Sequence, residues 1–259
     1  MTAQLKSSTQ DGTMVLLLSN PSQRNALGPD IYAAGIETLN RAGDSAEVRS
    51  VVLAGEGPWF SAGGSLQRLQ ANREREPQDQ AQSIEGLHNW IEAMRALPKP
   101  IIAAVEGAAA GAGFSLALAC DFIVAARDAV FAASYSNIAL SPDGGMSWHL
   151  AQILPRQIIS EWMMLGERIA AERLHALGVV NQLADSGQAL GSALALAEKL
   201  NGRAPNALAS AKELLGEARG TSLSTQLDAE REHFVRNLHH PNAGIGIAAF
   251  LAKEKPRYS

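Results

Sequence analysis

Residues 99–121 read KPIIAAVEGAAAGAGFSLALACD, an apolar run that passes through small residues into a second apolar run. Ile101 to Val105 are continuously apolar, which is typical of a strand buried on both faces. The small side chains of residues 107–119 predict a tight turn followed by a helix. Such a strand-to-helix junction presents free N–H groups and lets a ligand approach the backbone, although tight packing of a helix on a sheet requires the same residues.

Around this stretch the chain alternates between short strands and helices, and it then becomes helical. Strands are expected at residues 15–18, 51–54, 122–125 and 130–132, and helices near 30–41 and 83–96. The charged segment 66–82 predicts a solvated helix or a mobile loop, and Ser141-Pro142 predicts the start of a helix. After residue 155 only Val179 to Asn181 favour a strand, while helices are favoured at 186–201, 205–219, 221–239 and 243–253. The pattern predicts an α/β fold with a helical C-terminal extension in one folding unit.

Charge and composition exclude several classes of protein. The chain has 22 Lys and Arg against 26 Asp and Glu, a net charge of −4 that suits neither nucleic acid nor an anionic membrane. The first ten residues lack the apolar core of a signal peptide, and no apolar run reaches the roughly 20 residues that span a bilayer, so a soluble cytoplasmic protein is expected. Cys120 is the single cysteine, which excludes a disulfide scaffold and predicts a buried side chain. The histidines show no metal-ligand spacing, so no metal site is expected.

Two small-residue turns and one acid are the candidates for chemistry. The turns are residues 60–66 (FSAGGSL) and 107–114 (GAAAGAGF), and backbone N–H groups from both would together make an oxyanion hole. The second turn lacks the third glycine of a dinucleotide-binding loop, and the motif around Ser115 lacks the last glycine of a serine-hydrolase elbow. Asp143 is either an acid favoured by a helix N-terminus, or a general base or nucleophile that faces an apolar pocket.

Together these motifs resemble the crotonase (enoyl-CoA hydratase/isomerase) superfamily. The similarity runs through residues 20–27 (NPSQRNAL), 60–66 and 99–121, and it extends through nearly the whole chain. It implies an α/β fold with a crotonase-like spiral of ββα units over residues 1–195 and a helical trimerisation region over residues 196–259. It also implies a homotrimer or a dimer of trimers, an acyl-CoA substrate, and no cofactor beyond the coenzyme A thioester itself.

The resemblance assigns the acyl-CoA site residue by residue. The backbone N–H groups of Gly64 and Ala112 would form the oxyanion hole for the thioester. Ala62 and Gly63 would lie along the adenine of coenzyme A. Arg24 matches a basic position near the coenzyme A phosphates.

Some of the remaining residues match the family pattern, and others differ from it. Phe250 and Lys253 match an aromatic and basic pair that completes the coenzyme A site of a neighbouring subunit. Hydratases of the superfamily carry glutamates where this chain has Ser115 and Tyr135, so the usual two carboxylates for water addition are missing. Asp143 is similar to the aspartate on which a subset of the family relies, ring-enoyl-CoA isomerases among them.

One carboxylate is sufficient to move a double bond, because nothing is added to the substrate. The resemblance therefore favours an enoyl-CoA isomerase in which Asp143 transfers the proton. Three alternatives stay open. The first is an enoyl-CoA hydratase. The second is an enzyme like the aroyl-CoA dehalogenases, in which Asp143 would be the nucleophile, His88 the base and Tyr135 the aromatic residue of the pocket. The third is a non-catalytic acyl-CoA-binding protein.

Overall fold

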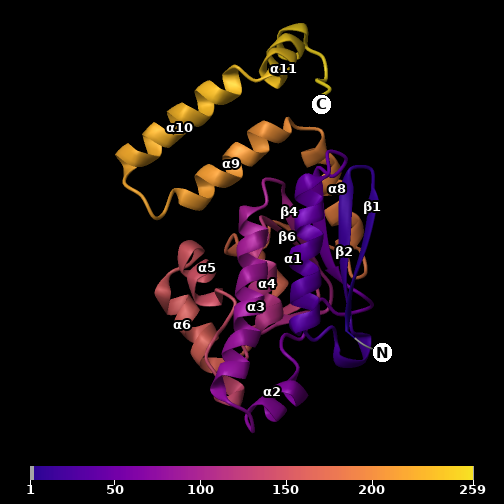
Figure 1. Cartoon of the computed structure of the whole chain (residues 1–259), viewed down its shortest axis with the longest axis vertical. Helices are drawn as coiled ribbons and strands as arrows, with labels where there is room; N and C mark the ends of the chain where they lie inside the picture. Colours follow the sequence, from indigo (N-terminus) through magenta and orange to yellow (C-terminus); the bar gives the residue numbers. More distant parts are fainter. Residues whose placement is uncertain (1–2, 259) are drawn as a thin grey trace.

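The computed structural model describes residues 3–258, which fold around a six-stranded sheet (Figure 1). In spatial order the strands are β1 (Gln4–Gln10), β2 (Thr13–Ser19), β3 (Ser50–Gly55), β4 (Ile101–Val105), β6 (Phe122–Ala126) and β9 (Gln182–Ala184). β1 and β2 pair antiparallel, and each later neighbour pairs in parallel. Parallel neighbours require crossover connections, and most of these connections contain helices.

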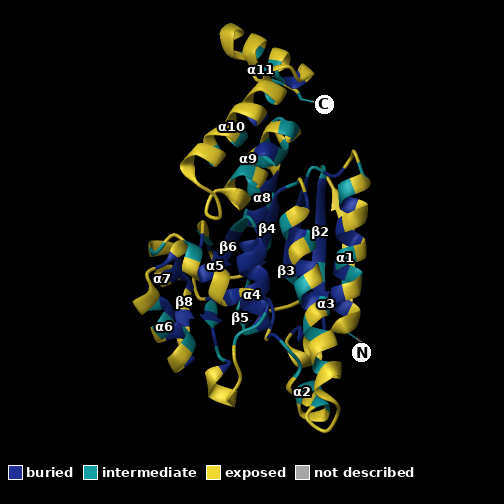
Figure 2. Cartoon of the chain, turned by 60° about the vertical axis from the view of Figure 1, so that its left-hand side comes forward, coloured by how far each residue is buried: buried dark blue, intermediate teal, exposed yellow. Residues whose placement is uncertain are grey.

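The central strand β4 is buried on both faces, as its apolar sequence predicts. Ile101 and Ala103 belong to one core cluster, and Ile102 and Ala104 belong to the other. Residues of α1 (Pro29–Asp44) and α3 (Pro77–Ala96) complete the first cluster, and residues of α8 (Ala189–Asn201) complete the second (Figure 2). A strand covered by helices on both sides has no polar face, which explains the unbroken apolar run.

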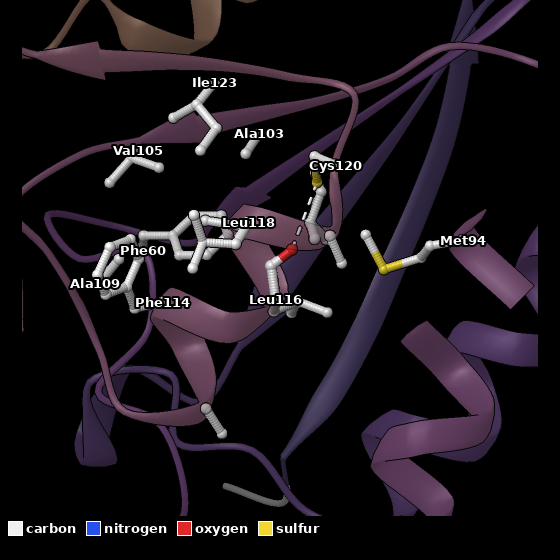
Figure 3. Packing of buried hydrophobic residues seen from close by; sticks show 14 of the residues in the cluster. Phe60, Met94, Ala103, Val105, Ala109, Phe114, Leu116, Leu118, Cys120 and Ile123 are labelled. Carbon is white, nitrogen blue, oxygen red and sulfur yellow. Dashed lines mark hydrogen bonds between the residues drawn. The ribbon is translucent and has the colours of Figure 1, made fainter. Parts of the chain in front are cut away.

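A short sheet and a buried helix follow β4 directly. The sheet has the order β5 (Ala108–Ala110), β7 (Val130–Ala132) and β8 (Arg168–Ala170). Helix α4 (Ala112–Ala119) is buried along its whole length, and its Phe114 belongs to the same packed cluster as Phe60 and Ala109 (Figure 3). The Cys120 thiol donates to the carbonyl oxygen of Leu116 at 3.5 Å, and burial raises its pKa. The predicted buried position of Cys120 is confirmed.

The last three helices extend beyond the sheet (Figures 1 and 2). They are α9 (Pro205–Glu217), α10 (Leu223–Leu238) and α11 (Pro241–Ala252). The Lys212 ammonium ties α9 to the core, since it donates to the Asp121 carboxylate at 2.8 Å and to the carbonyl oxygen of Met94 at 2.9 Å. The expected division after residue 195 falls within α8, which packs on the sheet, so we propose that the separate helical region begins at α9.

The remaining helices lie in the connections around α4. They are the short 3-10 helices η1 (Pro21–Gln23) and η2 (Ser136–Ile138) and the helices α2 (Leu66–Asn72), α5 (Met146–Ile153), α6 (Arg156–Leu165) and α7 (Ala171–Ala176). The charged segment 66–82 is therefore divided between α2 and the start of α3, which begins at Pro77.

Two local predictions are wrong, and the strands β1, β5 and β8 were not predicted. Ser141-Pro142 begins no helix, and α5 starts at Met146, because Gly144 and Gly145 adopt φ values of 58° and 74°, which are left-handed. Residues 179–181 only lead into β9. No strand was expected at β1, because this exposed edge strand carries polar residues on both faces. The first difference matters most, since it leaves Asp143 in a loop.

Candidate active site

A cavity of about 750 Å³ lies beside the N-terminus of α4. Its walls come from residues near η1, from the turn before α2 and α2 itself, from α3, and from the loop between β7 and α5. Seven residues singled out from the sequence line it: Arg24, Ala62, Gly64, His88, Ala112, Tyr135 and Asp143. The fold therefore brings both small-residue turns and the candidate acid to one place.

The two small-residue turns lie side by side at this cavity. The backbone N–H of Ser61 donates to the carbonyl oxygen of Ala108 at 3.0 Å, and that of Ala110 donates back to Ser61 at 2.9 Å. Gly63 has a φ of 84°, and a Cβ there would lie 2.6 Å from the carbonyl oxygen of Ala110. Only glycine meets both requirements, so the sequence of the first turn follows from its approach to the second.

Two backbone donors are available at the junction of the turns. Ala112 is the first residue of α4, where a helix leaves its N–H groups without intrahelical partners. Within residues 3–258 the N–H groups of Gly64 and Ala112 donate to no acceptor, and both residues line the cavity. Backbone donors of this kind are what an oxyanion hole requires.

Asp143 presents the acid at the cavity. Its carboxylate accepts a hydrogen bond from the Tyr135 hydroxyl at 2.6 Å, and its backbone carbonyl accepts one from the Ser115 hydroxyl at 2.9 Å. Burial raises the pKa of the Asp143 carboxyl, and the Tyr135 hydrogen bond and the charge of His88 oppose that rise. The result is a carboxyl group in a largely apolar setting, which suits a group that both takes and returns a proton.

Tyr135 acts on Asp143 as a hydrogen-bond donor. Burial, followed by the neighbouring Asp143 charge, raises the pKa of the Tyr135 hydroxyl, so the hydroxyl keeps its proton at neutral pH. The side chains of Ser115 and Tyr135 are also within 3.4 Å of each other. Ser115 and Tyr135 therefore hold Asp143 in place, one through its backbone carbonyl and the other through its carboxylate.

The other residues assigned from the resemblance lie at different distances from this centre. Arg24 lines the cavity, and its guanidinium lies 5.4 Å from the centre of the Trp59 ring. His88 lines the same cavity from α3. Phe250 is 83% exposed on α11, and Lys253 caps that helix, well away from the cavity of the same chain (Figure 1). A role for Phe250 and Lys253 in a neighbouring subunit stays a prediction.

Two charged or polar residues of the cavity were not predicted from the sequence, and they matter for its chemistry. Arg68 on α2 and Tyr32 on α1 both line it. Arg68 stands in a charged segment that reads as a solvated face, and Tyr32 stands on the apolar face of a helix. Neither pattern contains a local signal, because the two side chains meet only after α1 and α2 have packed.

Residues 3–258 contain no group of three or more His, Cys, Asp or Glu side chains arranged to hold a metal ion. Among the same residues, no helix is both long and apolar enough to cross a bilayer.

Comparison with known proteins places these features in a family context. The chain matches the sequence model of the family described as Enoyl-CoA hydratase/isomerase over residues 8–259. It is 32% identical to the 1,2-epoxyphenylacetyl-CoA isomerase of Escherichia coli (strain K12) over 254 residues, which are 98% of this chain and 97% of that protein. It is 31% identical to the 2,3-dehydroadipyl-CoA hydratase of the same organism, over 97% of this chain and 96% of that one.

Solved structures agree with the sequence comparison. A crystal structure of an enoyl-CoA hydratase from Polaromonas sp. JS666 has a TM-score of 0.97 and 65% identity, and the match covers 98% of this chain and 99% of that one. The structure of Pseudomonas aeruginosa DspI has a TM-score of 0.94 and 28% identity, over 100% of this chain and 97% of that one. The expected α/β fold and the resemblance read from the sequence are both confirmed.

Proposed function

The chain belongs to the enoyl-CoA hydratase/isomerase (crotonase) family, and from this premise we propose that it moves the double bond of an enoyl-CoA with Asp143 as its single carboxyl acid and base. One observation carries the choice of reaction. Of the described residues that line the cavity, Asp143 alone has a carboxyl group. Double-bond migration needs only one such group, because the proton that leaves the substrate is the one that returns.

The proposed reaction begins with proton removal by the Asp143 carboxylate. The C–H bond next to the thioester breaks, its electrons move toward the carbonyl, and the thioester oxygen becomes an enolate oxygen. The N–H groups of Gly64 and Ala112 stabilise this developing negative charge. The protonated Asp143 then delivers the proton to the γ carbon, so the double bond moves into conjugation and the carboxylate is restored.

Hydration of a 2-enoyl-CoA is the second candidate, and the comparisons favour it over isomerisation. The structure that shares 65% identity with this chain is named an enoyl-CoA hydratase. In that reaction Asp143 would take a proton from water while the hydroxyl group adds to the β carbon, and the α carbon would receive the proton. The Tyr135 hydroxyl, which belongs to a cavity-lining residue and donates to Asp143, would then be the polar group next to the attacking water.

A panel of thioesters distinguishes these reactions. A 3-enoyl-CoA, a 2-enoyl-CoA and 4-chlorobenzoyl-CoA are incubated separately with the enzyme, and the products are separated by mass. Isomerisation predicts a product of unchanged mass from the 3-enoyl-CoA. Hydration predicts the gain of one water by the 2-enoyl-CoA, and halide release identifies the dehalogenase reaction. If every thioester binds and none is converted, the chain is an acyl-CoA-binding protein and the proposal is wrong.

The hydrogen bond from Tyr135 leads to a prediction about pH. Tyr135→Phe removes a donor that favours the ionised form of Asp143, so the pKa of Asp143 should rise. A hydrogen bond to a charged group is worth about 1.5–3 kcal/mol. Because Asp143 must be ionised to take a proton, the acid limb of kcat/KM against pH should move to higher pH.

Ser115→Ala is the matched control for this pH profile. The Ser115 hydroxyl donates to the backbone carbonyl of Asp143 and not to its carboxylate, so its loss should leave the acid limb near its original position. If the acid limb of Tyr135→Phe stays in place or moves to lower pH, Tyr135 does not stabilise the ionised form of Asp143.

We also propose that α9 to α11 form a subunit interface in a homotrimer or a dimer of trimers, in which Phe250 and Lys253 reach a neighbouring acyl-CoA site. Large apolar side chains are exposed on these helices, and they include Leu215, Leu223, Phe234, Phe250 and Leu251. Apolar surface of this extent is typical of an interface. The mass in solution, measured by light scattering, should be three or six times that of the chain, and a monomer at micromolar concentration would contradict the proposal.

A further inference from the structure

Arg68 places a positive charge at the cavity without a counter-charge from the protein. It lies on α2 and lines the cavity. No ion pair within residues 3–258 includes it, and its buried Nε has no hydrogen-bond partner there. A guanidinium at a cavity without a carboxylate partner from the protein favours an anion from outside the chain.

Arg68 packs beside Gly28 and Tyr32 at the wall of the cavity. Its guanidinium packs against the backbone of Gly28, where a Cβ atom would collide with it. Burial raises the pKa of the Tyr32 hydroxyl, the Arg68 charge and a hydrogen bond with Arg68 lower it, and the Asp143 charge raises it. Arg68 and Tyr32 therefore lie beside each other, and both line the cavity that Asp143 also lines.

No other charged group of the cavity forms an ion pair with the Arg68 guanidinium among the described residues. Asp143 is the one carboxylate among the described lining residues, and its near partner is the Tyr135 hydroxyl. Ile84 and Leu87 of α3 line the cavity as well and offer no acceptor. Arg24 also lines the cavity without an ion pair among residues 3–258, and its guanidinium lies 5.4 Å from the centre of the Trp59 ring. An apolar wall with a guanidinium that has no carboxylate partner suits a ligand that is apolar along its length and anionic at one end.

We propose that Arg68 binds a carboxylate at the far end of the acyl group, so that the substrates are acyl-CoA thioesters of dicarboxylic acids. This inference rests on the proposed function, because it deepens the specificity of the same cavity. A guanidinium is planar and presents paired N–H donors that match the two oxygens of a carboxylate. Such a pair fixes the end of the acyl chain and thereby places its reactive carbons beside Asp143.

The test compares the binding of saturated thioesters in pairs of equal chain length. The pairs are butanoyl-CoA with succinyl-CoA, pentanoyl-CoA with glutaryl-CoA, and hexanoyl-CoA with adipyl-CoA. In at least one pair the dicarboxylic member should bind the wild-type enzyme at least tenfold more tightly by calorimetry. Arg68→Met should abolish that preference and leave the affinity for the neutral member within about twofold, and Arg68→Gln should do the same.

Arg73→Met is the matched control, because Arg73 caps the same helix, is exposed and does not line the cavity. It should keep the full preference. Equal loss of affinity for both members of a pair in the Arg68 variants would assign Arg68 to coenzyme A itself and overturn the inference. The absence of a preference at all three chain lengths in the wild-type enzyme would overturn it too.

This experiment is independent of the reaction. Saturated thioesters have no double bond to move or hydrate, so binding is measured without turnover. A preference that depends on Arg68, together with no turnover of any enoyl-CoA, would leave the inference standing and contradict the proposed function. Turnover of enoyl-CoA esters without any preference for a dicarboxylic thioester would support the proposed function and contradict the inference about Arg68.

Discussion

Asp143→Asn is expected to lower kcat on the enoyl-CoA substrate by about 10²–10⁴-fold, the usual contribution of a positioned acid or base. Asparagine keeps the shape of the side chain and still offers an oxygen to the Tyr135 hydroxyl, which donates to the carboxylate at 2.6 Å in the native protein. It cannot accept the substrate proton. Steady-state kinetics should therefore show a fall in kcat with little change in KM.

The stability of the same variant separates catalysis from folding. Burial raises the pKa of Asp143, so ionisation of this group opposes folding, and the cost appears as the pH rises from the ordinary carboxyl pKa through the raised one. The neutral asparagine avoids that cost. The melting temperature of Asp143→Asn at pH 7 should be equal to or above that of the wild type.

Asp185→Asn provides a matched control for Asp143→Asn. The side chain of Asp185 is 90% exposed, so this substitution should leave both kcat and melting temperature near the wild-type values. If Asp143→Asn kept wild-type kcat on every convertible thioester, Asp143 would not be the acid and base.

Ala112→Pro is expected to lower kcat by about 10²–10³-fold, the usual cost of losing one oxyanion donor. Ala112 is the first residue of α4, a position where proline is tolerated because its missing N–H has no intrahelical partner. Gly111 precedes it and has no side chain to collide with the proline ring. The substitution thus removes one of the two proposed donors, and steady-state kinetics measures the loss.

Ala112→Gly keeps the N–H group and should retain kcat within a few fold. Thermal melting of both variants checks that α4, which is buried along its length, remains packed. A proline variant that folds and turns over at the wild-type rate would show that the Ala112 N–H takes no part in the reaction.

Much of the fold was predictable because its signals are local. The unbroken apolar run of β4 arises from residues that alternate between two core clusters, and a run of five such residues leaves few alternatives to a doubly covered strand. β1 carried no such signal, since all its residues except Leu5 are polar and it pairs through its backbone at the edge of the sheet. The helix expected from Ser141-Pro142 was wrong because the effect of Gly144 and Gly145 on the backbone outweighed the capping signal.

The candidate site likewise contains some features that the sequence predicts and others that it does not. The small-residue turns were recognisable, because close approach of two backbones demands glycine at Gly63 and the demand is visible in the sequence. The contacts that hold Asp143 were not recognisable from the sequence, since Ser115 on α4 lies 28 positions before Asp143 in the chain. Arg68 was missed for the same reason, because its setting is created by Gly28 and Tyr32 of another segment.

A crystal structure with an unreactive acyl-CoA bound tests the central claim most directly. The account predicts that the thioester oxygen lies about 2.7–3.1 Å from the backbone nitrogens of both Gly64 and Ala112, with the Asp143 carboxylate facing the carbon next to the carbonyl. A bound thioester whose oxygen points away from both nitrogens would contradict it, whatever the position of Asp143.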